Sequence, residues 1–222
     1  MVAKKLTVVV PTCRSIDHIL QVIRDFRNQT YKNFEMIIVH DGTIDTMWEY
    51  AVQSERSENM YYTEIPKSND KWPGTTARHK GTELAKTEFI VFCDDDDRYK
   101  DIYLENLMFS TSGNHVTVVQ MQVTKNKVFK NGNPKETTLI PAYGMDIFPV
   151  VCHVGTPCCA VRTEWANAWP WRDIKDHDYH FFAEIIKNLH FKVSKIPGAV
   201  VDVDGAVIGK LKNWVSKPPF IR

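Results

Sequence analysis

The sequence predicts an α/β protein with a mostly parallel central sheet flanked by helices. Short β-branched apolar runs alternate with amphipathic segments over the first hundred residues, which is the pattern of successive βαβ units. Such runs are typical of parallel strands that are covered on both faces. The 222 residues are 43% hydrophobic and 25% charged, which is enough apolar material for a sizeable core in one domain.

The first elements follow in a regular order. Leu6–Val10 is a β-branched run stopped by Pro11, and it predicts the first buried strand. Ile16–Arg27 carries apolar side chains at helical spacing and predicts the first helix. Phe34–Val39 predicts a second buried strand, which ends at His40-Asp41-Gly42.

The next elements continue the alternation. Trp48–Ser54 predicts a short helix, and Met60–Ile65 predicts a third, weaker strand. Thr76–Ala85 predicts another helix. Glu88–Cys93 predicts a fourth strand that leads into four consecutive aspartates, Asp94 to Asp97. We expect this strand to lie in the centre of the sheet.

The second half of the chain has a different pattern. Val116–Val123 and Lys127–Lys130, with Asn131-Gly132 beyond, predict a hairpin. A helix is expected from about Asp178 to Asn188, and the last 22 residues carry no assignment. Because no repeat or linker interrupts the chain, we expect residues 1–222 to form a single domain.

Composition excludes several classes of protein. The net charge of +1 favours neither nucleic acid nor an acidic partner. The N-terminus has no long apolar segment of a secretory signal, and no apolar run approaches the roughly 20 residues that cross a bilayer. A soluble, cytoplasmic protein with no integral membrane segment is therefore expected.

The five cysteines fit reduced thiols better than a disulfide framework, because their number is odd. The segment CHVGTPCC, residues 152–159, could be imagined as a zinc site. It lacks the paired C-x₂-C spacings of structural zinc modules, so buried thiols are the preferred interpretation.

Three polar segments follow predicted strands, and ligands of open parallel sheets bind at the carboxyl ends of strands. These segments are Pro11 to Arg14, His40 to Thr43, and Asp94 to Asp97. Crowded carboxylates are tolerable if a divalent cation neutralises them, and Mg²⁺ or Mn²⁺ takes oxygen ligands. The acidic run therefore predicts a metal seat for a phosphorylated substrate. The alternative is a solvated acidic turn.

Several of these segments resemble family 2 glycosyltransferases, which adopt the GT-A fold with a Rossmann-like sheet. The similar motifs are Pro11-Thr12, Gln29-Thr30-Tyr31, His40-Asp41-Gly42-Thr43 and the block GTTARHKGTELAKTEFIVFCDDDD. Their order and spacing carry the resemblance over roughly the first 110 residues, and it is thin beyond them. It implies a nucleotide-sugar-binding half, residues 1–110, and an acceptor-binding half, residues 111–222.

The resemblance implies a nucleotide-diphosphate sugar donor, of the UDP class, together with Mn²⁺ or Mg²⁺. Asp41 would contact the nucleotide base, and Arg78 would approach the diphosphate or the donor sugar. Asp96 of the Asp-x-Asp would bind the metal directly, with Asp97 as a helper and His153 as a further ligand. The expected donor-binding residues are Pro11, Thr12, Arg14, Asp41, Arg78, Asp94 and Asp95.

The chain departs from the family pattern at three places. His40 stands where the family usually has Asp, Cys13-Arg14 replaces a common Tyr-Asn, and His79 replaces the usual Asn. Structural interpretations of the motif residues also stay open. Asp41-Gly42 could be a simple turn and Arg78 a surface residue, whereas His40 and His153 could be hydrogen-bonded structural histidines.

The resemblance also implies an inverting reaction, in which one general base removes the proton of the acceptor hydroxyl. The family carries Glu-Asp before an aromatic residue, and the matching segment here is His177-Asp178-Tyr179. Asp178 is the first candidate for the base and Asp176 the reserve. The alternative is that either aspartate only caps the helix, and both roles can coexist.

The acceptor is a glycan, a lipid, a protein or a modified nucleic-acid base, and the sequence does not choose among these classes. Trp165, Trp169 and Trp171 could stack on a sugar or pack a core. Lysines near the predicted hairpin and in the tail could form a basic face or be solvated: Lys125, Lys127, Lys130, Lys135, Lys210, Lys212 and Lys217.

Two other functions compete with an active glycosyltransferase. A nucleotidyltransferase would carry a Gly-rich basic loop after its first strand, and PTCRSIDH has no glycine. A degenerate GT-A domain would bind a nucleotide or glycan without turnover, and His40, Cys13 and His177 at motif positions favour it. The retained Asp94, Asp96 and Asp178 favour the enzyme.

Overall fold

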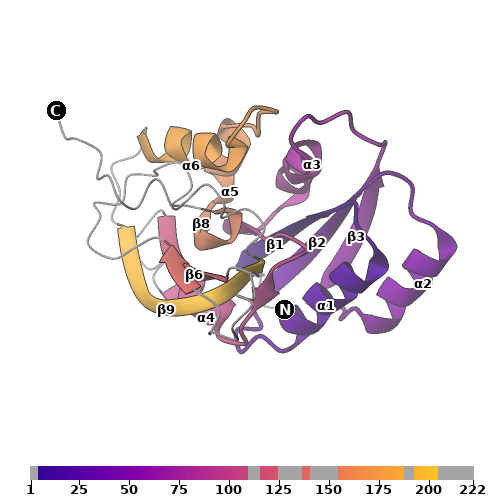
Figure 1. Ribbon diagram of the computed structural model, residues 1–222, viewed down its shortest axis with the longest axis horizontal. Helices are drawn as coiled ribbons and strands as arrows, with labels where there is room; N and C mark the ends of the chain where they lie inside the picture. Colours follow the sequence, from indigo (N-terminus) through magenta and orange to yellow (C-terminus); the bar gives the residue numbers. More distant parts are fainter. Residues whose placement is uncertain (1–4, 110–115, 125–136, 141–154, 188–192, 205–222) are drawn as a thin grey trace, which may run out of the picture.

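The computed structural model describes residues 5–109, 116–124, 137–140, 155–187 and 193–204. The described strands form one sheet with the order β3-β2-β1-β4-β8-β6-β9-β5, and β7 pairs with β6 beside this path. Helices cover both faces of the sheet (Figure 1). The α/β architecture expected from the sequence is confirmed.

Four parallel strands build the first half of the sheet. They are β1 (Leu6–Thr12), β2 (Phe34–Asp41), β3 (Met60–Ile65) and β4 (Phe89–Phe92). All residues of β1 and β4 are buried, and β4 lies between β1 and β8, so the expected central position is confirmed. β1 and β2 extend two residues beyond the predicted ends, so that Thr12 and Asp41 are the last residues of their strands.

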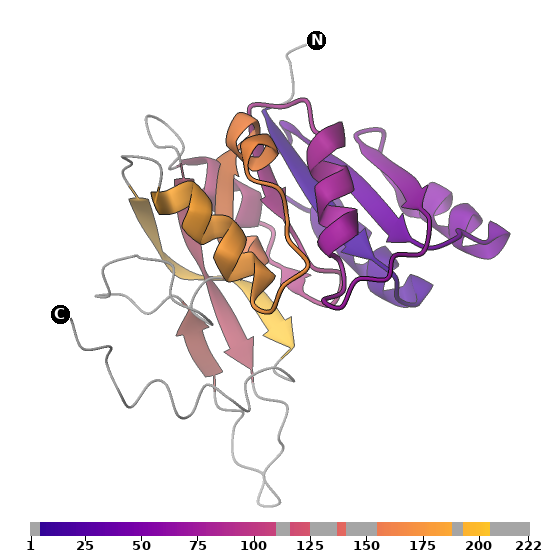
Figure 2. The ribbon, with the colours of Figure 1, turned by 90° about the horizontal axis from the view of Figure 1, so that it is seen from above.

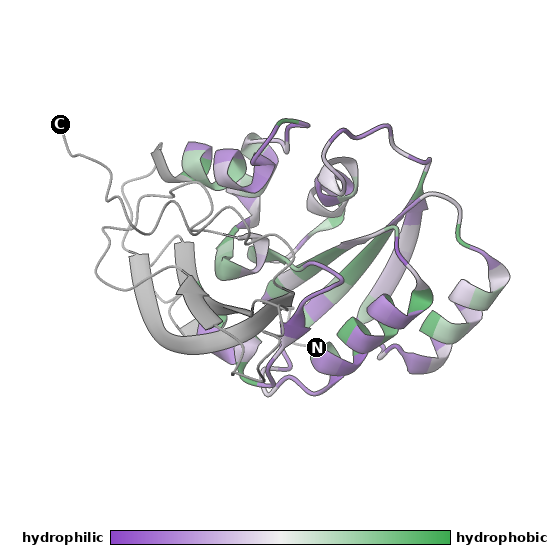
Figure 3. Cartoon of the chain, viewed as in Figure 1, coloured by the Kyte–Doolittle hydropathy of each residue, from purple (hydrophilic) through white to green (hydrophobic). Residues whose placement is uncertain are grey.

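The helices lie in two layers. α1 (Ile16–Arg27) and α2 (Thr46–Glu55) cover one face, while α3 (Thr75–Leu84), α5 (Thr163–Ala168) and α6 (His177–Lys187) lie on the other (Figures 1 and 2). In α1, the helical spacing of the apolar residues places their side chains against the sheet. The strands around β1 and β2 are largely hydrophobic, and the helices on either side of them carry hydrophilic residues (Figure 3).

Helix α3 approaches the sheet closely because it carries a glycine at the contact. A Cβ atom built on Gly81 would lie 2.2 Å from Cγ1 of Val9 in β1. No side chain fits at that distance, so the glycine lets the helix backbone rest directly on the strand. This contact fixes the height of α3, and with it the position of Arg78, above the sheet.

The second half of the chain extends the sheet with antiparallel pairs. β6 (Val116–Thr124) pairs with β8 (Cys159–Arg162), and β8 pairs with β4. β6 also forms an antiparallel pair with β7 (Thr137–Ile140), which lies farther along the chain than the second strand of the expected hairpin. The predicted second strand, Lys127–Lys130, lies outside the described residues.

One long strand falls in a region without a predicted element. β9 (Val193–Asp204) runs parallel to β6 and is also paired with the short β5 (Arg98–Tyr99). The register jumps from Val119–Ile196 to Gln120–Ala199, so that Pro197-Gly198 is passed over in a bulge. A bulge is where a sheet accommodates proline, and this is why the sequence pattern of the strand is interrupted.

The remaining helix, α4 (Tyr103–Phe109), packs against β6, β8 and β9. Its Tyr103 is fully buried and donates a hydrogen bond to the carbonyl oxygen of Pro157. Among the helices that the structure describes, none is long and apolar enough to cross a membrane.

Candidate active site at the carboxyl ends of the strands

A cavity of about 230 Å³ opens where β1, β2 and β4 end. The three polar segments that follow these strands meet there, as expected for the carboxyl ends of neighbouring parallel strands. Helix α3 supplies the opposite wall. The lining residues are Pro11, Thr12, Cys13, Arg14, Asp41, Pro73, Gly74, Ala77, Arg78, Asp94, Asp95, Asp96 and Asp97.

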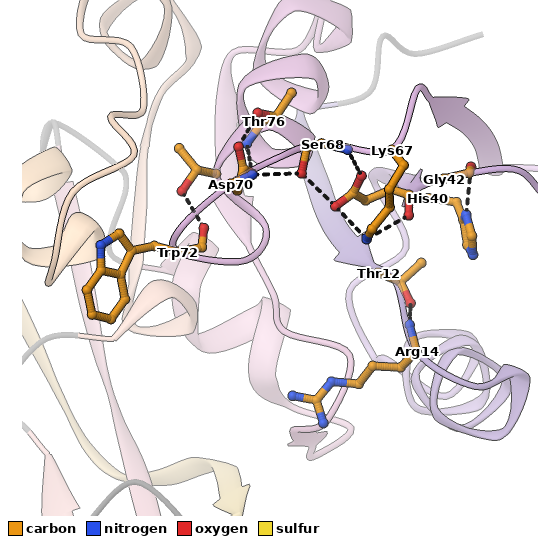
Figure 4. A network of polar contacts seen from close by, with 11 residues as sticks. Thr12, Arg14, His40, Gly42, Lys67, Ser68, Asp70, Trp72 and Thr76 are labelled. Carbon is orange, nitrogen blue, oxygen red and sulfur yellow. Dashed lines mark hydrogen bonds and ion pairs between the residues drawn. The ribbon is translucent and has the colours of Figure 1, made fainter.

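Asp41, the last residue of β2, accepts hydrogen bonds from Lys67 and Ser68, which are labelled in Figure 4. The amide of Ser68 donates to Oδ1 at 2.6 Å, while the Ser68 hydroxyl and Lys67 Nζ reach Oδ2 at 2.8 and 3.1 Å. Burial alone would raise the pKa of Asp41, but these donors overcome it and hold the pKa below its usual value. The carboxylate is therefore ionised and fixed in orientation.

The loop between β3 and α3 that supplies these donors is itself tied down. Asp70 accepts hydrogen bonds from the amide and hydroxyl of Thr76 at 2.8 and 2.6 Å, at the start of α3. Asp173, from the segment before α6, accepts from the amides of Lys71 and Trp72 at 2.9 and 2.8 Å. Residues from both halves of the sequence thus hold this loop beside the cavity.

His40 has a structural role. Its Nδ1 lies 3.0 Å from the carbonyl oxygen of Gly42, and its ring contacts Trp48 edge-on at 5.2 Å. His40 is absent from the cavity lining. His40 is therefore hydrogen-bonded to the backbone, as its structural interpretation expects.

Arg78 is buried, with 6% of its surface exposed, so its interpretation as a surface residue is wrong. Its Nη2 donates to Asp94 Oδ1 at 2.5 Å, and its Nη1 donates to His177 Nε2 at 3.1 Å. The guanidinium also lies over the ring of Trp171, 5.2 Å from its centroid. Gly74 makes room for it, since a Cβ there would lie 2.8 Å from Nη1.

His177 joins helix α6 to this arginine. Because Arg78 donates to Nε2, the imidazole is neutral and carries its proton on Nδ1. Burial, followed by the positive charge of Arg78, lowers the pKa of His177 to about 4. Nδ1 of His177 and Nε of Arg78 are both buried and have no hydrogen-bond partner among the described residues.

The acidic run divides into two sets of contacts. Asp94 is paired with Arg78 and also accepts from the Thr156 hydroxyl at 2.8 Å. Asp95 accepts from the Thr12 hydroxyl at 2.6 Å. Arg14 spans the next two carboxylates, with Nε 3.3 Å from Asp95 and Nη2 2.8 Å from Asp96.

Negative charge accumulates at this cluster. Asp97 is 3% exposed, and burial together with the charges of the other three aspartates raises its pKa well above the usual value. Burial also raises the pKa of Asp95, against the opposing hydrogen bond from Thr12. The four carboxyl groups outnumber the two arginines that contact them, Arg14 and Arg78, and the raised pKa of Asp97 means that a further negative charge is disfavoured at this cluster.

The donor set fits Mn²⁺ or Mg²⁺ in its chemistry. Within the described part of the chain, no three His, Cys, Asp or Glu side chains are already arranged to hold a metal ion. These cations commonly use one or two carboxylates and complete their shell with water and substrate phosphates. A pair of aspartates beside a cavity large enough for a diphosphate meets that requirement.

Asp176 and Asp178 lie at the start of α6. The carbonyl oxygen of Asp176 accepts the first helical hydrogen bond, from the amide of His180 at 3.1 Å, and Asp176 has a φ of 55°. Asp178 Oδ1 accepts from the amide of Tyr179 at 2.8 Å. Burial raises the pKa of Asp178, and the charges of Arg78 and Asp94 also act on it. Neither aspartate lines the described cavity.

The three predicted tryptophans and three of the cysteines lie in or against the core. Trp171 stacks on Phe181 with ring centroids 4.2 Å apart, and Trp165 and Trp169 pack against the core. Cys93, Cys158 and Cys159 are buried thiols, as expected, and Cys13 is exposed. Several predicted residues lie outside the described part of the chain: Cys152, His153, Lys125, Lys127, Lys130, Lys135, Lys210, Lys212 and Lys217.

Sequence inspection missed Lys67, Ser68 and Thr156 at this site. Lys67 and Ser68 lie two and three residues beyond the end of β3, so the search at strand ends that located the other segments could have found them. Thr156 lies in a short turn before β8, which runs antiparallel to β4, and no motif marks it.

The match to a family model decides the family. Residues 7–168 match the model of glycosyl transferase family 2. This chain belongs to that family. It is 27% identical over 157 residues to an uncharacterized glycosyltransferase of Rickettsia conorii, a match that covers 69% of this chain and 25% of that protein. The chain spans about a quarter of the length of the first curated relatives it matches.

Solved structures show the fold of this family 2 chain. The structure of S. aureus TarS 1-349 in complex with UDP-GlcNAc matches with a TM-score of 0.69 at 17% identity, over 90% of this chain and 58% of that one. The mannosyltransferase PcManGT from Pyrobaculum calidifontis, in complex with GDP-Man and Mn²⁺, matches with a TM-score of 0.65 at 14% identity, over 96% and 60%. The chain has the GT-A fold of these glycosyltransferases.

Proposed function

We propose that the chain is an inverting, metal-dependent glycosyltransferase that moves a sugar from a UDP-sugar to an acceptor hydroxyl. The observation that carries the proposal is the meeting of Asp41, Arg78 and the run Asp94 to Asp97 at one cavity, in a chain that belongs to glycosyl transferase family 2. The domain is a single one, with residues 1–110 forming the donor half and residues 111–222 the acceptor half.

Asp41 would recognise the nucleotide base. Its ionised carboxylate accepts an N–H of the base, such as the ring N–H of uracil or guanine. Oδ1 accepts one hydrogen bond, from Ser68, so one of its lone pairs is available. The similar structures hold UDP-GlcNAc and GDP-Man, and both of their bases carry such a ring N–H.

Asp96 and Asp97 would hold the Mn²⁺ or Mg²⁺, with Asp94 and Asp95 beside them. The bound cation would neutralise the charge that develops on the diphosphate leaving group. Arg78 supplies a second, fixed positive charge at the same cavity, because its guanidinium is held by Asp94 and His177. A charge that is already oriented costs no reorganisation during the reaction.

Asp178 would act as the general base. It takes the proton of the acceptor hydroxyl while the acceptor oxygen forms its bond to the anomeric carbon. The bond from that carbon to the diphosphate oxygen breaks, and its electron pair leaves with the nucleotide. Attack opposite the leaving group inverts the anomeric centre. Burial raises the pKa of Asp178, and a raised pKa makes a carboxylate a stronger base.

The first experiment identifies the donor. Thermal shifts are measured with UDP, GDP, ADP and CDP and with their sugar conjugates, each with and without Mn²⁺. Binding to the native state raises the melting temperature by mass action, so a metal-dependent shift with UDP or a UDP-sugar supports the proposal. A shift with GDP alone changes the donor class, and no shift with any nucleotide contradicts it.

The second experiment tests the base and the stereochemistry. Slow hydrolysis of an α-linked UDP-sugar is followed by proton NMR, because water can replace the unidentified acceptor. Early release of the β-anomer supports inversion. Asp178→Asn should abolish turnover without changing UDP affinity, and Asp176→Asn is the matched control. If Asp178→Asn retains activity and Asp176→Asn loses it, Asp176 is the base.

A further inference from the structure

Arg14 lies where a metal ion would have to bind. Its guanidinium spans two neighbouring carboxylates of the acidic run, 3.3 Å from Asp95 Oδ1 and 2.8 Å from Asp96 Oδ2. A divalent cation binds carboxylate oxygens at about 2.0 to 2.6 Å and repels a second cation at this range. The guanidinium and a metal ion therefore exclude one another on Asp96.

The two partners differ in how firmly they are held. Half of the Arg14 side chain is exposed, whereas Asp95 is 7% exposed and receives the Thr12 hydroxyl at 2.6 Å. Arg14 stands in the irregular segment between β1 and α1, and its amide is 3.5 Å from the Thr12 hydroxyl (Figure 4). Asp95 is thus held by a second contact, and the exposed arginine is the partner that can leave.

We propose that Arg14 is an internal counter-cation that occupies the metal position in the unliganded protein and couples metal binding to donor binding. This proposal rests on the proposed function of the site. Before the donor arrives, Arg14 competes with Mn²⁺ for Asp95 and Asp96. A diphosphate in the same cavity offers the displaced guanidinium a new anionic partner, because Arg14 lines that cavity.

The consequence is a thermodynamic coupling. Mn²⁺ alone must break two ion pairs, whereas Mn²⁺ together with UDP replaces them with contacts to the diphosphate. UDP therefore raises the affinity for Mn²⁺, and Mn²⁺ raises the affinity for UDP by the same factor. Arg14 is a positioning and gating residue in this scheme, and it takes no proton and forms no bond.

The test is a titration with MnCl₂ on the full chain, read by the electron paramagnetic resonance signal of free Mn²⁺. Arg14→Gln removes the charge and should tighten binding of Mn²⁺ alone by roughly two- to fivefold, the range expected for losing a competing ion pair. Arg14→Lys keeps the charge but cannot span both carboxylates in the same geometry. Its affinity for Mn²⁺ should therefore lie between those of the wild type and Arg14→Gln.

The coupling is measured by repeating the titration at saturating UDP, after the association of Mn²⁺ with UDP in solution has been measured separately. The wild type should show a larger gain in Mn²⁺ affinity on adding UDP than Arg14→Gln. Equal Mn²⁺ affinity of wild type and Arg14→Gln, or an unchanged gain with UDP, overturns the proposal.

A matched control separates this effect from a general change of charge. Arg27 is also about half exposed and also forms an ion pair, with Glu55 at 2.8 Å, on the helix that follows Arg14. Arg27→Gln should leave Mn²⁺ binding unchanged. The same titration shows whether the acidic run binds a metal ion at all. If it does not, neither the wild type nor Arg14→Gln will bind Mn²⁺ more tightly than Asp96→Ala does.

Discussion

Two arginines contact the same acidic run in opposite ways. Arg78 is buried between Asp94, His177 and the ring of Trp171, and a glycine makes room for it. Arg14 is half exposed and touches its carboxylates from an irregular segment. Arg78 is therefore surrounded by protein, whereas half of the Arg14 side chain is exposed to solvent.

This difference separates a permanent charge from an exchangeable one. Removing one partner leaves the other without its counter-ion, and the side chains of Arg78 and Asp94 are 7% and 31% exposed, so the two groups stabilise the fold as a pair. An exposed ion pair gains little over its hydrated partners, so Arg14 can leave at small cost. Arginine thus has two roles at the acidic run. Arg78 is a structural residue beside Asp94, and Arg14 is a replaceable cation beside Asp95 and Asp96.

The largest expected effect is that of Arg78→Ala. It leaves Asp94 with its Thr156 hydrogen bond but without its positive partner, and it removes the guanidinium from the face of Trp171. The free energy of unfolding should fall by about 3 kcal/mol, which urea denaturation measures.

A second substitution tests the reason for this loss. Asp94→Asn in the Arg78→Ala background removes the unpaired charge and should recover part of the stability. A loss below about 0.5 kcal/mol for Arg78→Ala would show that Arg78 is exchangeable, like Arg14, and the contrast between the two arginines would fail.

Gly81→Ala tests how the permanent arginine is positioned. The added Cβ would meet Cγ1 of Val9 at 2.2 Å, so α3 must move away from β1 and carry Arg78 with it. We expect a loss of about 2 kcal/mol by urea denaturation, from overpacking. The double variant Val9→Ala/Gly81→Ala removes the clashing methyl groups and should be more stable than Gly81→Ala alone. If it is not, the contact with Val9 is not the cause.

Much of the fold was predictable because its strands are continuous apolar runs. Ile16–Arg27 and Met60–Ile65 match α1 and β3 at both ends. The strand β9 was missed because Pro197-Gly198 interrupts it, and proline in a run argues against a strand unless a bulge accommodates it. That bulge is a property of the pairing with β6, which the sequence of β9 alone does not contain.

The candidate site was predictable where it follows strand ends. Asp41 and Asp94 to Asp97 could be placed together because parallel strands end at the same edge of a sheet. The hydrogen bond between Arg78 and His177 joins residues 99 positions apart. No local pattern predicts such a pair, and the pairing of Arg14 with Asp95 and Asp96 depends likewise on how the loops meet.

A smaller effect should come from the pH dependence of His177. Its pKa is about 4 in the folded protein and about 6.5 in the unfolded chain, so the unfolded state binds more protons between these values. The stabilising contribution of neutral His177 is complete above pH 6.5 and is lost as pH falls toward 4. Between pH 7 and 5 the loss should be on the order of 1 kcal/mol, allowing for partial exposure.

His177→Gln is the comparison that isolates this contribution, because its side-chain oxygen can still accept a hydrogen bond from Arg78. The carboxylates of the site titrate in both proteins and cancel in the difference between their stability–pH curves. The wild type should lose more stability than His177→Gln between pH 7 and 5. Parallel curves would mean that the histidine titrates as freely in the folded protein as in the unfolded chain.

The smallest expected effect is that of Arg14→Gln on stability. The variant loses contacts to Asp95 and Asp96, but the arginine is half exposed and Asp95 keeps its hydrogen bond from Thr12. The free energy of unfolding should change by less than about 1 kcal/mol, and by a similar amount in Arg27→Gln. A loss as large as that of Arg78→Ala would place Arg14 in the scaffold, because a side chain that costs so much to remove cannot yield its carboxylates to a metal ion.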